Sequence, residues 1–156
     1  MTTSVTAPVR KAITVPAAPA RAFEIFTARI GEWWSPDHHI APEPFETVVL
    51  EPHSGGRWYE RSASGAECTW GYVIAWEPPT RLVLAWQLNA DFAFDADLVT
   101  EVELRFIAVD GSSTRVELEH RDLDRYGDAA EKTRTALDSG GGWTLLLDRF
   151  AEHVRA

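Results

Sequence analysis

The spacing of apolar residues changes twice along this chain, and these changes constrain the fold more than any other feature. From Phe45 to His120, apolar and polar residues alternate with a period of two, which is typical of half-buried β-strands. Beyond Gly142 the period becomes 3.6, and one helical face carries Trp143, Leu146, Leu147, Phe150 and Val154. The sequence therefore predicts a run of antiparallel strands followed by an amphipathic helix that reaches the C-terminus.

The segment before this run predicts one strand and one short helix. A strand over 9–15 should end at Pro16, because proline cannot donate to a β-ladder, and Pro19 suits the first turn of a helix. The helix is expected over 20–30, where one face is formed by Phe23, Phe26 and Ile30.

A hairpin in the first half of the run predicts an aromatic stripe. Strands over 57–62 and 67–76 flank a three-residue turn over 63–65, which places Gly65 at a left-handed position. The register set by this turn pairs Glu60 with Cys68 and Trp58 with Trp70. One face then carries Trp58, Glu60, Cys68, Trp70, Tyr72, Ile74 and Trp76.

The second half of the run predicts three more strands. In the strand over 81–88, one face is formed by Leu82, Leu84, Trp86 and Leu88, but the register across Pro78-Pro79 is left open. A turn over 110–112 joins the last two strands, and it pairs Phe106 with Val116, Leu104 with Leu118 and Val102 with His120. His120 therefore ends an inward-facing row.

The order of these elements predicts an α+β fold. A curved antiparallel sheet of six to seven strands should wrap round a long C-terminal helix, with a short helical segment after the first strand. We expect one domain over 8–156 and a disordered N-terminus over 1–7. Whether residues 128–137 form a separate helix or the start of the last one stays open, because Gly140-Gly141-Gly142 lies between them.

Composition excludes several classes of partner and cofactor. Asp and Glu number 24 against 15 Lys and Arg, and the net charge of −9 argues against a nucleic-acid partner. No apolar stretch is long enough to insert in a membrane, and the N-terminus lacks a signal-peptide pattern, which predicts a cytoplasmic protein. The single cysteine, Cys68, can form neither an internal disulfide nor a zinc site, so no metal or other cofactor is expected.

Several landmarks resemble a known family. They are Trp33-Trp34, Gly55-Gly56-Arg57-Trp58, Gly71-Tyr72-Val73, Glu77-Pro78-Pro79-Thr80-Arg81-Leu82, Trp86, Glu117-Leu118-Glu119-His120 and Gly142-Trp143. In this order the chain resembles the START-like (SRPBCC) helix-grip superfamily, and within it the bacterial branch similar to the C-terminal domain of the heat-shock-protein-90 ATPase activator. The resemblance implies a helix-grip fold with a ligand cavity. No Walker A loop is present, so ATP hydrolysis is not expected.

The seven tryptophans predict where that cavity lies. A buried indole N–H needs a hydrogen-bond acceptor, which a cavity wall supplies more readily than a solid apolar core does. Ordinary core packing of the aromatic stripe is the alternative. The predicted ligand-binding residues are Trp34, His39, Trp58, Glu60, Trp70, Trp86, His120, Trp143 and Leu147.

Glu60 and His120 are the ionisable residues that the predicted registers place on apolar rows. Buried acids and bases have shifted pKa values, so the pair could transfer protons in an aromatase or cyclase reaction. The alternative is structural: His120 ends a strand, and Glu60 pairs with Arg57 or Arg61.

The loop over 35–44 predicts a lid over the cavity, with His38 or His39 as a polar contact. A metal site made by Asp37-His38-His39 with His53 or Glu60 is the alternative, but adjacent histidines rarely reach one ion. Cys68 has no basic neighbour in sequence and is expected to be an unreactive thiol.

Three functions follow. The first is binding of a small hydrophobic or aromatic molecule between sheet and helix by a carrier or sensor. The second is an enzyme that uses Glu60 and His120. The third is a protein-interaction domain for a chaperone partner. The sequence leaves a homodimer open.

Overall fold

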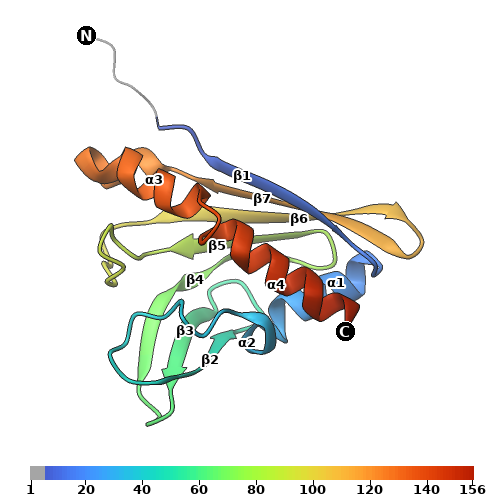
Figure 1. Cartoon of the computed structure of the whole chain (residues 1–156), viewed down its shortest axis with the longest axis horizontal. Helices are drawn as coiled ribbons and strands as arrows, with labels where there is room; N and C mark the ends of the chain where they lie inside the picture. Colours follow the sequence, from blue (N-terminus) through green and yellow to red (C-terminus); the bar gives the residue numbers. More distant parts are fainter. Residues whose placement is uncertain (1–5) are drawn as a thin grey trace.

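The computed structural model describes residues 6–156, and within them seven antiparallel strands form one curved sheet in the order β1-β7-β6-β5-β4-β3-β2 (Figure 1). The strands are β1 (Val9–Val15), β2 (Phe45–Leu50), β3 (Arg57–Ser62), β4 (Glu67–Glu77), β5 (Arg81–Trp86), β6 (Thr100–Asp110) and β7 (Ser113–Arg121). The predicted fold class is confirmed.

The helices lie against one side of this sheet, where α4 crosses the strands and packs on β1, α1 and α2 (Figure 1). They are α1 (Pro19–Thr27), α2 (Ile30–Trp33), the 3-10 helix η1 (Leu123–Ala129), α3 (Ala130–Asp138) and α4 (Trp143–Arg155). The core therefore fills the space between the inner face of the sheet and α1 and α4.

The first helical segment is divided, which corrects the single helix expected over 20–30. Helix α1 begins at Pro19 and ends at Thr27, and Arg29 leaves the helical region before α2 starts. The turn brings Gly31 against β2, where a Cβ on Gly31 would lie 2.0 Å from Oγ1 of Thr47. The chain must therefore change direction between α1 and α2 so that α2 can pack on β2. The spacing of apolar residues does not predict this turn.

The glycine run separates α3 from α4, which settles the question of helix continuity. Gly142 is the residue before α4, and a Cβ there would lie 2.3 Å from the carbonyl oxygen of Leu137 at the end of α3. The predicted apolar face of α4 is buried at Trp143, Leu146, Leu147, Phe150 and Val154.

The β3–β4 hairpin follows the predicted register only near its turn. Glu60 pairs with Cys68 as expected, but Trp58 pairs with Gly71, because Trp70 is the extra residue of a β-bulge. A Cβ on Gly71 would lie 1.7 Å from the Ala85 carbonyl oxygen on β5. The close approach of these two strands explains why the bulge contains a glycine.

The bulge moves part of the predicted aromatic stripe to the other face of the sheet. Tyr72 is 39% exposed on the outer face, so its predicted inward position is wrong. Ile74 is the extra residue of a second register shift and does not continue the stripe. Trp76 returns to the inner face, where its ring centroid lies 5.0 Å from that of Phe23.

The other predicted registers hold. Val102 pairs with His120, and the pairs Leu104–Leu118 and Phe106–Val116 follow toward the turn. The row Leu82, Leu84, Trp86 and Leu88 is buried, although β5 ends at Trp86. Across the Pro78-Pro79 turn, Trp76 pairs with Leu82.

Charged residues cover the outer face of the sheet around Glu103. Its carboxylate accepts hydrogen bonds from Arg121 and Arg81, each at 2.6 Å, and from Arg105 at 3.1 Å. Burial disfavours ionisation of Glu103, but these hydrogen bonds outweigh it and lower the pKa of Glu103 to about 2.

Of the N-terminal segment expected to be disordered, residues 1–5 lie outside the described residues. The Ala7 and Pro8 carbonyls accept hydrogen bonds from Arg134, at 2.8 Å and 3.2 Å. The chain is thus tied to α3 from Ala7 onward.

Candidate functional site

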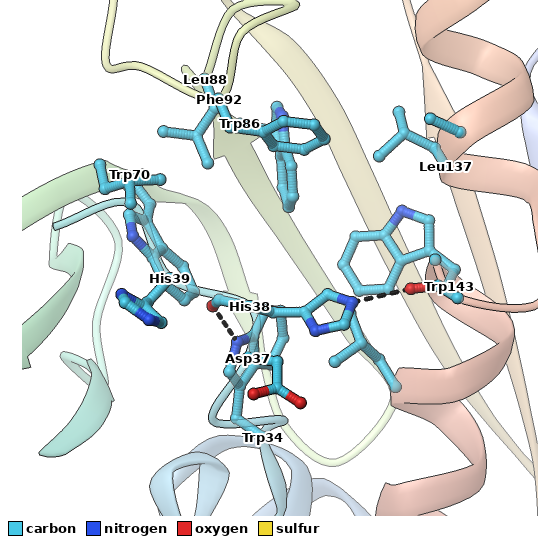
Figure 2. Close-up of a pocket in the computed structure, with 15 residues that line it drawn as sticks. Trp34, Asp37, His38, His39, Trp70, Trp86, Leu88, Phe92, Leu137 and Trp143 are labelled. Carbon is cyan, nitrogen blue, oxygen red and sulfur yellow. Dashed lines mark hydrogen bonds between the residues drawn. The ribbon is translucent and has the colours of Figure 1, made fainter. Parts of the chain in front are cut away.

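A pocket of about 320 Å³ opens where the inner face of the sheet meets the start of α4 (Figure 2). Its wall contains four tryptophans that come from four separate parts of the fold. Trp34 directly follows α2, Trp70 lies on β4, Trp86 ends β5, and Trp143 begins α4. The prediction that these four residues lie at a cavity agrees with this geometry.

The tryptophan rings touch one another around the pocket. The ring centroid of Trp34 lies 5.1 Å from that of Trp70 and 6.2 Å from that of Trp143, and Trp86 lies 5.7 Å from Trp143. Trp58 packs behind this wall, 5.5 Å from Trp70, and does not line the pocket. The predicted ligand contact of Trp58 is therefore not supported by its position.

Hydrogen bonds hold three of the four indoles in place. The Nε1 atom of Trp34 donates to the His38 carbonyl at 2.9 Å, and that of Trp70 donates to Glu60 at 2.8 Å. Nε1 of Trp143 donates to Nδ1 of His120 at 3.1 Å. The pocket wall is thus preorganised rather than formed by freely rotating side chains.

Glu60 is fully buried and organises the loop that follows Trp34. One carboxylate oxygen accepts a hydrogen bond from the Ile40 amide at 2.6 Å, and the other accepts one from the Ala41 amide at 3.3 Å. The Trp70 indole donates a third hydrogen bond to the Glu60 carboxylate. Glu60 pairs with neither Arg57 nor Arg61, which corrects the structural alternative stated above, since these arginines pair with Glu67 and Glu46.

His120 is fully buried and has both ring nitrogens occupied. Because Nδ1 accepts from Trp143, the ring proton is on Nε2, which donates to Oγ1 of Thr100 at 2.8 Å. The Thr100 hydroxyl donates in turn to the Trp86 carbonyl at 3.2 Å. Burial lowers the pKa of His120 to about 3, so the ring is neutral at neutral pH.

The structure does not bring Glu60 and His120 together at the pocket. Neither residue lines it, and each uses its polar atoms for a separate set of partners. Leu147 also lies outside the lining, where the preceding residue, Leu146, is found instead. The proton-transfer pair expected from the sequence therefore lacks the geometry that the mechanism requires.

The loop predicted as a lid does lie at the pocket, where Asp37, His38, His39 and Ile40 line one side. Nε2 of His38 donates to the Gly141 carbonyl at 2.7 Å, which connects this loop to the turn before α4 (Figure 2). His38 therefore joins two walls of the pocket.

The histidines of the alternative metal site do not converge on one point. His39 Nδ1 lies 2.9 Å from the Ala41 carbonyl and 3.9 Å from Glu60, whereas His38 is bonded to Gly141. The Nδ1 atom of His53 donates a hydrogen bond to the Ser54 carbonyl at 3.0 Å. Among residues 6–156 no three His, Cys, Asp or Glu side chains form a group that could hold a metal ion.

Cys68 is half-buried on β4. Burial raises the pKa of its thiol, and the carboxylates of Glu60 and Glu43 act in the same direction. The thiol is therefore protonated at neutral pH, in agreement with the expected low reactivity.

Several lining residues were not identified from the sequence. Leu137 comes from the end of α3, and Leu88 follows β5, where its carbonyl accepts a hydrogen bond from the Tyr126 hydroxyl at 2.7 Å. Phe92 lies in the loop between β5 and β6, which has no apolar periodicity. The turn-forming Asn89 is the signal that could have directed attention to this loop.

Across residues 6–156, every helix is too short or too polar to span a bilayer.

Comparisons with solved structures place the chain among proteins with this architecture. An anthrahydroquino-gamma-pyrone synthase, Txn09, shares 36% identity with a TM-score of 0.65, and the match covers 95% of this chain and 97% of that one. The self-sacrificing resistance protein CalC from Micromonospora echinospora shares 31% identity with a TM-score of 0.69, over 96% and 94% of the two chains. Protein NE0264 from Nitrosomonas europaea has a TM-score of 0.67 at 12% identity, over 98% and 97% of the two chains, and supports the fold alone.

A search of curated proteins gives no match. The family model described as activator of Hsp90 ATPase homolog 1-like protein matches residues 16–155, which is nearly the whole chain. The matched region contains the tryptophan wall, the loop held by Glu60 and helix α4. The chain therefore belongs to the family of activator of Hsp90 ATPase homolog 1-like proteins, within the helix-grip SRPBCC superfamily.

Proposed function

We propose that this protein binds a small, flat aromatic molecule in the pocket between the sheet and α4. The observation that carries the proposal is the meeting of four tryptophan rings from four elements around about 320 Å³. This volume lies in the range of small-molecule sites, and aromatic walls favour stacking or edge contacts with a flat ligand.

The polar groups of the pocket suit a ligand with oxygen substituents. Asp37, His38 and His39 line one side, opposite the largely apolar remainder of the wall. The apolar remainder includes the four tryptophan rings of the wall, from Trp34, Trp70, Trp86 and Trp143. A hydroxylated fused-ring molecule combines both properties.

The comparisons support the same ligand class. The solved structure at 36% identity is named as a synthase of an anthrahydroquinone-derived pyrone, a fused-ring compound. A cyclase-type reaction is therefore the second candidate for this chain. Its proton-transfer groups would be Asp37, His38 or His39, because Glu60 and His120 do not line the pocket.

Replacing Trp86 with leucine should weaken binding of alizarin, a dihydroxyanthraquinone, by about tenfold, which corresponds to about 1.4 kcal/mol. The substitution removes one aromatic ring from the pocket wall and leaves in place the hydrogen bonds that hold Trp34, Trp70 and Trp143. Isothermal titration calorimetry measures the dissociation constants of the wild type and Trp86→Leu.

Tyr72→Leu is the matched control, because Tyr72 lies on the outer face of the sheet and should leave affinity unchanged. Cholic acid, a saturated and bent ring system, should bind far more weakly than alizarin does. The proposal is wrong if the wild type does not bind alizarin, or if Trp86→Leu binds it as tightly as the wild type. Mass spectrometry of alizarin after incubation should show an unchanged molecule if the protein is a binder alone.

A further inference from the structure

Phe92 is an exposed aromatic residue held at the pocket by an unusual backbone conformation. Its side chain lines the pocket and is nevertheless 45% exposed. Its φ of 58° lies in the left-handed region, which a bulky residue rarely occupies without a compensating role.

Asn89 holds this conformation through side-chain and backbone contacts. Its Oδ1 atom accepts hydrogen bonds from the Asp91 amide at 2.9 Å and from the Ala93 amide at 3.1 Å. Its carbonyl accepts from the Phe92 amide at 2.9 Å, and its amide donates to the Ala93 carbonyl at 2.8 Å. Four hydrogen bonds thus fix a turn that presents the Phe92 ring.

The ring lies on the side of the pocket formed by β5 and the residues that follow it. Figure 2 shows Phe92 beside Trp86 and Leu88, across the pocket from His38 and Trp34. An apolar ring that is nearly half exposed at a pocket gains buried area when a ligand occupies the space beneath it. Within residues 6–156, the other side chains therefore leave this aromatic surface only partly buried.

We propose that Phe92 is a specificity-determining residue that covers the bound ligand and selects flat aromatic molecules. This inference rests on the proposed function, because it assigns one further contact in the same pocket. A flat ring system can lie between Phe92 and the tryptophan wall, whereas a bent saturated one of similar size cannot contact both surfaces. Phe92 thus adds selectivity for shape to a pocket whose other aromatic side chains are already fixed.

The strain at Phe92 gives the experiment two readouts with opposite signs. Glycine occupies positive φ without steric cost, so Phe92→Gly should keep or raise the melting temperature. The same variant should bind alizarin at least fivefold more weakly and release it faster in stopped-flow measurements. A residue with a purely structural role would lower stability when it is replaced.

Two further variants separate the ring from the backbone. Phe92→Ala should lose as much affinity as Phe92→Gly, and Phe92→Tyr should restore binding to within about twofold of the wild type because it keeps the ring. Phe94→Ala is the matched control: Phe94 is 43% exposed on the same loop but does not line the pocket, and its loss should leave affinity unchanged.

The outcomes distinguish this inference from the function on which it depends. Absence of alizarin binding by the wild type overturns both. Binding that Trp86→Leu weakens but that Phe92→Gly and Phe92→Ala leave unchanged overturns the role of Phe92 alone. Equal losses in Phe92→Ala and Phe94→Ala also overturn it, because the effect would then belong to the loop as a whole.

Discussion

Replacing Glu60 with alanine should lower the free energy of unfolding by about 3 kcal/mol or more. The buried carboxylate is the acceptor for the Ile40 amide, the Ala41 amide and the Trp70 indole. Each buried donor left without an acceptor costs about 1–3 kcal/mol, and hydrogen bonds to a charged acceptor lie at the upper end of that range. Urea unfolding followed by circular dichroism measures the change.

Two variants serve as controls for this prediction. Glu60→Gln keeps the shape of the side chain and one acceptor oxygen, so it should lose less stability than Glu60→Ala does. Glu46→Ala removes an exposed partner of Arg61 and should change stability by less than about 0.5 kcal/mol. A Glu60→Ala protein within 0.5 kcal/mol of the wild type would contradict the role assigned to this carboxylate.

The same prediction connects the fold to the pocket. Ile40 lines the pocket, and its amide is held by Glu60 from β3. Trp70, on the next strand, is held by the same carboxylate. One buried acid therefore fixes two walls of the pocket relative to each other, which is a structural reason for a buried carboxylate in this core. Loss of Glu60 should reduce alizarin affinity even where the fold survives.

The strands could be predicted closely because local patterns determine them. The strand over 9–15 ends before Pro16. The turn between β6 and β7 is short, and it sets the pairing of the two strands from Phe106–Val116 to Val102–His120. In such hairpins, a register shift of one residue would expose every apolar side chain, so alternation alone determines the pairing.

The β3–β4 pairing could be predicted only in part. Alternation carries no signal for an inserted residue, so the bulge at Trp70 displaced Tyr72 from its expected face. Gly71 did carry a signal, because an isolated glycine within a strand often marks a bulge or a close backbone contact. The contact itself is with Ala85 on β5, across a Pro-Pro turn whose register the sequence left open.

For the candidate site, the sequence predicted several residues that line the pocket, but not the hydrogen-bond partners of the ionisable residues Glu60 and His120. Glu60 and His120 do lie on inward rows, yet their partners come from distant segments: Ile40 in a loop, Thr100 on β6 and Trp143 on α4. Periodicity predicts which face of the sheet a residue occupies. It does not predict which group forms a hydrogen bond with that residue. The ligand contacts themselves stay predictions.

Acidification should destabilise the protein through His120 before any low-pKa carboxylate contributes. The pKa of His120 is lowered from an ordinary 6.5 to about 3 because the ring is buried among uncharged partners. The unfolded chain binds this proton below pH 6.5 and the folded chain does not, so stability falls as the pH decreases. Between pH 7.5 and 4.5 the expected loss is about 2.5 kcal/mol, measured by urea unfolding at each pH.

His120→Gln isolates this effect, because glutamine can accept from Trp143 and donate to Thr100 but does not titrate. The unfolding free energy of the wild type minus that of the variant should decrease by about 1.4 kcal/mol for each pH unit below pH 6. Titrating groups that both proteins share contribute equally to both values, so they cancel in this difference. Glu103, whose pKa is lowered to about 2, destabilises with the same sign only below about pH 4.5, outside this window. A difference that stays constant from pH 7.5 to 4.5 would show that the folded protein protonates His120 as readily as the unfolded chain does.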